Sequence, residues 1–189
     1  MTDEDLVRRC LAGDTRAMRT FVERFQGEIF AICVRLLNHR QDAEDIAQEV
    51  FVRLFHNLRR WDSNRPLRPW IHTITVNRCR TCLSRRLRIP SPVEHLEAIP
   101  ARSESQLSDE LVQGLRQAID HLRLEYREVF VLFHEQGLSY DEIAEVIQRP
   151  VGTVKTWLHR ARAIVLQRLR HDGLLNQDDA TVAEECHHR

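Results

Sequence analysis

The residues from Ser139 to Arg162 constrain the fold most, because they place two helix signals around a tight turn. Ser139 and Glu142 have the capping-box spacing that opens a helix. Pro150 and Gly152 then interrupt that helix, since proline cannot continue it and glycine tolerates unusual backbone angles. Apolar residues at helical spacing resume beyond the turn, namely Val154, Trp157, Leu158 and Ala161. The stretch therefore predicts a short capped helix, a turn and a second helix.

The other face of that second helix is basic and polar, with Lys155, Thr156, His159, Arg160 and Arg162. This arrangement is the helix-turn-helix layout, in which the second helix reads the DNA major groove. An ordinary helical hairpin with a solvated charged face is the alternative. The pattern favours DNA binding.

Charge is segregated along the chain although it sums to zero, with 28 basic and 28 acidic residues. The stretch 42–49 holds acids without a base, and 78–88 holds arginines without an acid: Asp42, Glu44, Asp45 and Glu49, then Arg78, Arg80, Arg85, Arg86 and Arg88. Such patches suit a basic partner and a phosphate backbone respectively. Interaction with helix dipoles is the alternative explanation of both.

Several function classes find no support. The five scattered cysteines form no disulfide framework, the N-terminus is too acidic for a signal peptide, and no apolar run reaches membrane-spanning length. We therefore expect a cytoplasmic protein without membrane insertion. No phosphate-binding glycine loop or nucleophile elbow occurs, so neither catalytic residues nor a cofactor are expected, and the protein is not expected to be an enzyme.

Metal ligation finds only weak candidates in the sequence. Cys79 and Cys82 have C-x-x-C spacing downstream of His72, and Cys186 precedes two histidines near the C-terminus. Zinc normally requires a second ligand pair beside such a motif, so no metal is expected at either place.

The rest of the chain predicts an all-α fold of two small domains joined by a flexible linker. Helical periodicity runs through segments 3–11, 14–25, 28–37, 42–58, 67–87, 108–122 and 125–135. Pro90, Pro92 and Pro100 interrupt residues 89–107, which we interpret as the linker. The predicted domains are 1–88 and 108–170, followed by a disordered tail at 171–189.

Trp61 lies beside arginines in a predicted loop, residues 58–66. An aromatic ring interleaved with arginines suits stacking on unpaired bases. A tryptophan that folds back onto the core is the alternative.

Four segments, in order, resemble the sigma-70 family of bacterial transcription factors, specifically its small extracytoplasmic-function (ECF) group. Residues 42–51 resemble the family signature D-A-E-D-x-x-Q-E-x-F. Residues 61–66, with Trp70, Ile71 and Asn77, resemble the region that follows it. Residues 138–144 and 152–162 resemble the group's C-terminal helix-turn-helix. Three positions depart from the common pattern: Gln148, where glycine is frequent, Trp157, where arginine is frequent, and Pro69, which replaces a more flexible residue before Trp70.

The resemblance implies three sets of binding residues. Binding to core RNA polymerase, through its beta-prime subunit and also beta, is implied for Asp42, Asp45, Gln48, Glu49 and Phe51. Contact with the minus-ten promoter element is implied for Trp61, Asn64, Trp70, Asn77, Arg78, Arg80, Arg85 and Arg86. Contact with the minus-thirty-five element is implied for Thr153, Lys155, Thr156, Trp157 and Arg160.

The implied function is that of a promoter-specificity subunit, with an anti-sigma factor as a further partner and no stable homo-oligomer. A stand-alone helix-turn-helix regulator that binds duplex operators is one alternative. A metal-dependent nuclease using the acids of residues 42–49 is another. Consecutive helical spacing spreads those carboxylates around the helix axis, which disfavours the nuclease.

Overall fold

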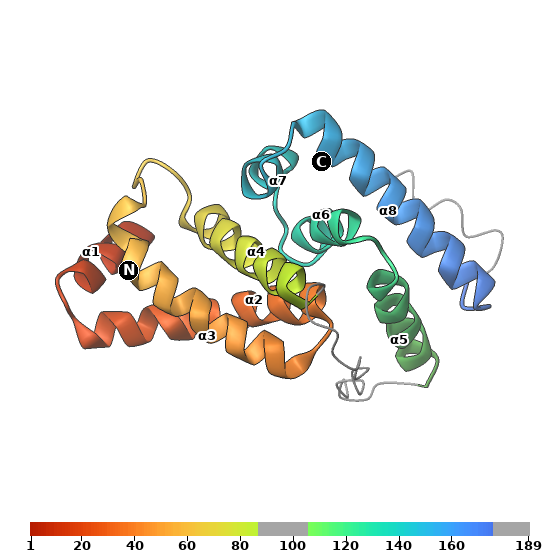
Figure 1. Ribbon diagram of the computed structural model, residues 1–189, viewed down its shortest axis with the longest axis horizontal. Coiled ribbons are helices and arrows are strands. Elements are labelled where there is room, and N and C mark those ends of the chain that lie inside the picture. Colours follow the sequence, from red (N-terminus) through yellow and green to blue (C-terminus); the bar gives the residue numbers. More distant parts are fainter. Residues whose placement is uncertain (87–105, 176–189) are drawn as a thin grey trace.

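The computed structural model describes residues 1–86 and 106–175 (Figure 1). Within these ranges the chain forms α-helices and one short 3-10 helix, η1, and no strand. The all-α prediction is confirmed. The elements are α1 (Asp3–Leu11), α2 (Thr15–Leu37), α3 (Arg40–Asn57), η1 (Leu58–Arg60), α4 (Leu67–Arg86), α5 (Gln106–Asp120), α6 (Leu124–His134), α7 (Tyr140–Ile147) and α8 (Val151–His171).

Helix α2 is the centre of the N-terminal half, where α1, α3 and α4 all pack against it. Its inward stripe is buried and begins with Ala17, Phe21 and Phe25. The ring of Phe21 lies 4.9 Å from that of Phe25 and 5.5 Å from that of Phe55, so aromatic contacts join α2 to α3. Burial of this stripe holds α3 and α4 in fixed positions on the surface of α2.

The sequence predicts two helical segments on either side of Gly27, whereas the structure joins them in one 23-residue helix. A glycine inside a helix costs only about 1 kcal/mol relative to alanine. The apolar stripe continues across Gly27 to Ile29 and Ile32, both fully buried. Tertiary burial therefore outweighs the local cost. Asn38 ends α2 in the left-handed conformation, with a φ of 49°.

In the C-terminal half α5, α6 and α7 pack against α8. The buried face of α8 runs along its whole length through Val154, Leu158, Ala161, Val165 and Leu169. Leu111 and Val112 of α5 are exposed, although their spacing also suits an apolar face. The long α8 thus forms one side of this half, and its first turns lie next to α7.

The two halves contact each other through α4 on α7 and α2 on α6 (Figure 1). Arg127 of α6 takes part in this contact. Its guanidinium donates to the carbonyl oxygen of Leu36 at 3.3 Å, and also to those of Leu122, at 3.1 Å, and Asp120. One side chain therefore satisfies carbonyl groups near the ends of α2 and α5.

Most of the predicted linker, 89–107, and the predicted tail from residue 176 lie outside the described residues, as does Cys186. The division into domains at these positions stays a prediction. None of the described helices has the length and apolar character that crossing a membrane requires.

Candidate nucleic-acid interface

The predicted turn between α7 and α8 is built by local backbone chemistry. Ser139 accepts from the backbone N–H of Glu142, whose carboxylate accepts from the backbone N–H of Ser139 at 2.8 Å, so the capping box is present. Gln148 ends α7 with a φ of 56°, a left-handed conformation that favours glycine. Pro150 is the N-cap of α8, which begins at Val151 and therefore two residues before the expected restart at Thr153.

The first turns of α8 present a polar face to solvent. Lys155, Thr156 and Arg160 are exposed, and Thr153 is half-buried. The ammonium of Lys155 lies 5.5 Å from the ring centre of Tyr140, so its side chain runs beside α7. Three side chains of the predicted minus-thirty-five set are therefore exposed on one helix.

Trp157 is half-buried, and its ring lies 6.3 Å from that of Tyr126. Arg160 donates to the hydroxyl of the same tyrosine at 3.4 Å. Trp157 thus packs on α6 while staying partly exposed beside the polar face of α8.

Nearby, burial together with the guanidinium of Arg162 lowers the pKa of His134 to about 4, so the imidazole is neutral and accepts from Arg162 Nε at 3.1 Å.

The arginines of α4 do not all point to solvent. Arg78 is buried and pairs with Glu49 of α3, and Arg86 pairs with Asp42 of α3. Arg85 is exposed. The α4 arginines predicted to contact the minus-ten element thus differ in position. Arg78 and Arg86 join α4 to α3, while Arg85 remains accessible to an outside ligand.

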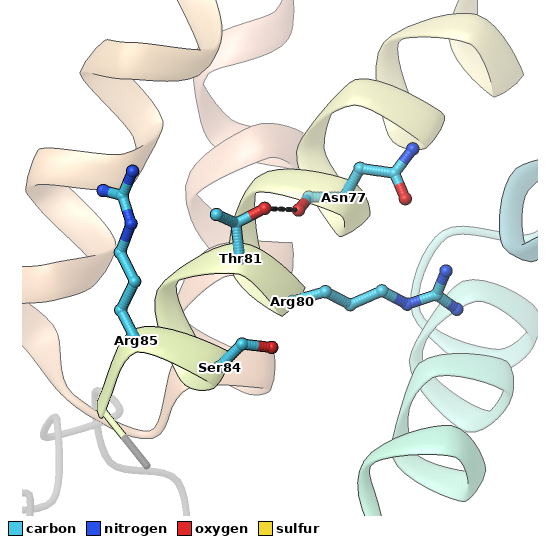
Figure 2. Close-up of a pocket in the computed structure, with 5 residues that line it drawn as sticks. All are labelled: Asn77, Arg80, Thr81, Ser84 and Arg85. Carbon is cyan, nitrogen blue, oxygen red and sulfur yellow. Dashed lines mark hydrogen bonds between the residues drawn. The ribbon is translucent and has the colours of Figure 1, made fainter. Parts of the chain in front are cut away.

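Arg80 points the opposite way, toward α6, and pairs with Glu128. A pocket of about 510 Å³ lies beside it along one face of α4, lined by Asn77, Arg80, Thr81, Ser84 and Arg85 (Figure 2). In this pocket the hydroxyl of Thr81 donates to the carbonyl of Asn77 at 2.8 Å. Amide, hydroxyl and guanidinium groups on one open face suit the phosphates and base edges of DNA.

Trp61 follows η1 and is half-buried against the core, where its Nε1 has no hydrogen-bond partner among the described residues. Asn64 is exposed in the following turn and donates to Asp62. Hydrogen bonds from Asn64 lower the pKa of Asp62 and keep this turn in shape. Trp70, at the start of α4, is also half-buried. The loop therefore combines a partly covered tryptophan with an exposed amide.

The acidic surface of α3 is exposed at Asp45, Gln48 and Glu49. Asp42 and Phe51 are half-buried, and Phe51 packs against the core. His39 caps the helix by accepting from the backbone N–H of Asp42 at 3.2 Å. The predicted polymerase set thus forms a polar surface on one helix with an apolar residue at its edge.

The C-x-x-C cysteines do not converge on a ligand position. The thiol of Cys79 lies 3.8 Å from that of Cys33, and the thiol of Cys82 lies 3.7 Å from a carboxylate oxygen of Asp42. The hydrogen bond with Cys33 and burial raise the pKa of Cys79, and burial raises the pKa of Cys82. Within residues 1–86 and 106–175 no three metal-ligating side chains gather.

Sequence reasoning missed the acidic side chains that face the N-terminal half, of which Glu128 is the most buried. It has 1% of its surface exposed, and burial raises the pKa of its carboxyl while Arg80 opposes that effect. The available signal was an acid directly before the apolar run 129–133 of α6. A carboxylate at a buried helical position requires a cation, and that cation lies in the other half.

Comparison with known proteins matches two sequence families in order. Residues 21–89 match Sigma-70 region 2, and residues 113–165 match Sigma-70, region 4. The chain is 30% identical over 181 residues to the RNA polymerase sigma-H factor of Pseudomonas aeruginosa, covering 89% of this chain and 94% of that protein. It is 34% identical over 181 residues to the ECF RNA polymerase sigma factor SigW of Bacillus subtilis, covering 87% of this chain and 95% of that protein.

The chain is an ECF sigma factor of the sigma-70 family. It is therefore a specificity subunit that binds core RNA polymerase and directs transcription initiation at promoters, as the resemblance implied.

Solved structures agree with this membership. The structure of CnrH in complex with the cytosolic domain of CnrY aligns with a TM-score of 0.66 and 27% identity, covering 90% of this chain and 98% of that one. The sigma factor RpoE of Bartonella quintana, crystallised with the anti-sigma factor NepR, aligns with a TM-score of 0.71 at 22% identity over 80% of this chain and 96% of that one. The second similarity concerns the fold alone.

Proposed function

We propose that this sigma factor divides its work among three surfaces. The α3 surface of Asp42, Asp45, Gln48, Glu49 and Phe51 docks on the beta-prime subunit of the polymerase, with beta as a further contact. The Trp61 loop and α4 bind the minus-ten element through Trp61, Asn64, Trp70, Asn77, Arg80 and Arg85. The first turns of α8 read the minus-thirty-five element through Thr153, Lys155, Thr156, Trp157 and Arg160.

The observation that carries this proposal is the exposure of distinct surfaces on α3 and α8. Acids are exposed on the first, and Lys155, Thr156 and Arg160 are exposed on the second. An exposed acidic helix suits a basic protein partner, and an exposed basic helix after a tight turn suits the major groove.

Two minus-ten residues receive a narrower role. Arg78 is buried and Arg86 bonds the carbonyl of Leu37 as well as Asp42, so both guanidinium groups already have partners inside the fold. We propose that they support the minus-ten surface by holding α4 against α3.

The remaining elements of the proposal follow from the role of a sigma factor. Residues 1–88 and 108–170 each bind one promoter element and are joined by the linker 89–107, so two weak DNA contacts combine into one stronger contact.

The protein works in the cytoplasm beside the polymerase and performs no chemistry of its own. An anti-sigma factor is a proposed partner, since RpoE of Bartonella quintana, which shares the fold, was solved in complex with the anti-sigma factor NepR.

Reconstitution with core RNA polymerase tests the proposal. The holoenzyme is expected to initiate at a subset of genomic promoters, and pull-down is expected to recover the core enzyme with the sigma factor. Duplex binding without any recovery of core polymerase would instead favour a stand-alone helix-turn-helix regulator.

Replacing Arg160 with alanine is expected to reduce minus-thirty-five recognition by about 1–3 kcal/mol, because an arginine fork contributes that much discrimination at a base pair. The measurement compares transcription from a promoter selected with the wild-type holoenzyme and from single-base variants of it. Arg170→Ala, an exposed arginine at the far end of the same helix, is the matched control. An unchanged minus-thirty-five preference would remove Arg160 from the reading surface.

Replacing Trp61 with alanine is expected to impair promoter opening more than duplex binding. Stacking of one unpaired base on an aromatic ring contributes about 1–3 kcal/mol. Permanganate footprinting of the holoenzyme–promoter complex reports the unpaired thymines, and Trp61→Phe, which keeps an aromatic surface, is the control. Equal opening by the alanine variant would assign the ring to core packing alone.

A further inference from the structure

Three cysteines gather where α2, α3 and α4 meet. Cys33 of α2 and Cys79 of α4 are both fully buried, and the thiol of Cys79 donates to that of Cys33 at 3.8 Å. Cys82 lies one turn after Cys79 on α4 and is half-buried, with its sulfur 3.7 Å from a carboxylate oxygen of Asp42 of α3. The surfaces proposed to bind polymerase and DNA use none of these thiols. The cluster therefore has chemistry that the proposed function does not require.

The two buried thiols are placed for a bond between two helices. A disulfide has a sulfur–sulfur distance of about 2.05 Å, so the two sulfurs would approach each other by about 1.8 Å from their present contact. Packed helices move by about 1–2 Å in many switching proteins. A disulfide between Cys33 and Cys79 can therefore form while α2 and α4 stay packed.

Cys82 is the member of the cluster that an oxidant reaches first. It is half-buried, whereas Cys33 and Cys79 are fully buried. Burial raises the pKa of Cys82, and Arg86 and Arg78 oppose that rise. The pKa of Cys79 is raised well above its usual range by its hydrogen bond with Cys33 and by burial. Because the thiolate is the form that attacks an oxidant, Cys82 reacts before Cys79.

We propose that the cluster is a site of oxidation by peroxides, at which Cys82 takes the oxidant and a disulfide between Cys33 and Cys79 is the stable product. With hydrogen peroxide, the sulfur of Cys82 attacks one oxygen and the O–O bond breaks. A sulfenic acid forms, and the thiol proton leaves with the second oxygen as water. The sulfur of Cys79 then attacks the sulfenic sulfur, a second water leaves, and a Cys79–Cys82 disulfide results.

Thiol–disulfide exchange completes the reaction. The sulfur of Cys33 attacks that of Cys79, and Cys82 departs as a thiolate that takes up the proton lost by Cys33. In total, two thiols give two electrons to one peroxide, and two waters form.

The exchange favours the bond between the helices. Residues at i and i+3 of a helix have Cβ atoms about 5–6 Å apart, more than the roughly 3.5–4.5 Å of a relaxed disulfide. A Cys79–Cys82 bond therefore strains the last turns of α4. The Cys33–Cys79 bond requires only the approach of two sulfurs that are already in contact. Because a strained disulfide is the more easily broken, the Cys33–Cys79 bond is the one that accumulates.

The product encloses α3 and the Trp61 loop in a covalent ring. Cys33 and Cys79 are 46 positions apart, and a bridge across a loop of that length restricts the unfolded chain. The oxidised N-terminal half is therefore expected to unfold at a temperature about 10 °C higher than the reduced one. In a compartment that keeps thiols reduced, the bond persists only while peroxide is present.

The test treats the full folded chain with hydrogen peroxide, with Cys186 replaced by serine so that it cannot take part. Peptide mass spectrometry without reductant locates the linkages, and thermal unfolding followed by circular dichroism measures stability. The expected product is a Cys33–Cys79 linked peptide together with the higher unfolding temperature. A thiol reductant is expected to reverse both changes.

Three variants separate the steps. Cys82→Ser is expected to slow the Cys33–Cys79 linkage about tenfold, because the remaining thiols react only through local opening. Cys33→Ala is expected to stop the reaction at the Cys79–Cys82 disulfide. Cys10→Ala is the matched control, since Cys10 is a buried thiol of α1, and it is expected to leave the linkage unchanged.

Oxidation that produces no Cys33–Cys79 linkage would overturn the proposal. A linkage that forms equally fast in Cys82→Ser would remove Cys82 as the point of entry, and an unchanged unfolding temperature would remove the stabilising role of the bond. The main result is read from a chain whose cluster is intact, so a variant that fails to fold leaves the test in place.

Discussion

Replacing Asp45 with arginine is expected to weaken binding to core RNA polymerase by about 3 kcal/mol, or roughly 100-fold, because a like charge placed against a complementary surface costs several kcal/mol. Asp45 is exposed on α3, where it accepts a long hydrogen bond from Gln41, at 3.5 Å. The substitution therefore changes the docking surface and leaves the core intact. Equilibrium binding of the labelled sigma factor to core enzyme measures the loss.

Glu23→Arg is the matched control for this prediction, because it makes the same charge change at an exposed position of α2. The control is expected to bind core polymerase within about twofold of the wild type, as substitutions away from an interface usually have small effects. Equal loss in the two variants would attribute the effect to net charge, and no loss in Asp45→Arg would place the docking surface elsewhere.

Replacing Phe21 with alanine is expected to lower the free energy of unfolding by about 3–5 kcal/mol, the usual cost of deleting a buried phenyl ring. Phe21 is fully buried, and its ring contacts those of Phe25 and Phe55. The substitution removes the aromatic link between α2 and α3, so the polymerase surface on α3 becomes less ordered as well. Denaturant unfolding followed by circular dichroism measures the change.

Val52→Ala serves as the control for Phe21, since Val52 lies on α3 with 58% of its surface exposed. It is expected to change the unfolding free energy by less than about 0.5 kcal/mol. A loss below about 1 kcal/mol for Phe21→Ala would mean that the surrounding side chains close the cavity, which the central position of α2 does not lead us to expect.

Local chemistry was enough to predict most helices. The capping box at Ser139 and Glu142 is present, and α1 spans the predicted residues 3–11. The predicted break of α2 at Gly27 was wrong, because the cost of a glycine in a helix is small compared with the gain from burying Ile29 and Ile32. That burial depends on neighbours distant in sequence. Periodicity indicates which face of a helix is apolar. It does not indicate whether the helix continues through a residue of low helix propensity such as Gly27.

The candidate site was less predictable, because a charged side chain can serve the fold or a ligand. Arg78, Arg80, Arg85 and Arg86 form one basic run in the sequence, yet they point toward α3, α6 and solvent. Their partners Glu49, Glu128 and Asp42 lie 29 to 48 positions away. Such pairing depends on tertiary packing, which a single sequence does not encode in any local pattern.

The three carbonyl contacts of Arg127 have a mechanical consequence. Two of them, to Asp120 and Leu122, join α5 to α6 within the C-terminal half, and only the bond to Leu36 crosses to the other half. Separation of the halves thus exchanges a single carbonyl partner of this arginine for water and keeps the α5–α6 joint intact. Arg127 therefore holds the joint between α5 and α6 independently of the contact between the halves.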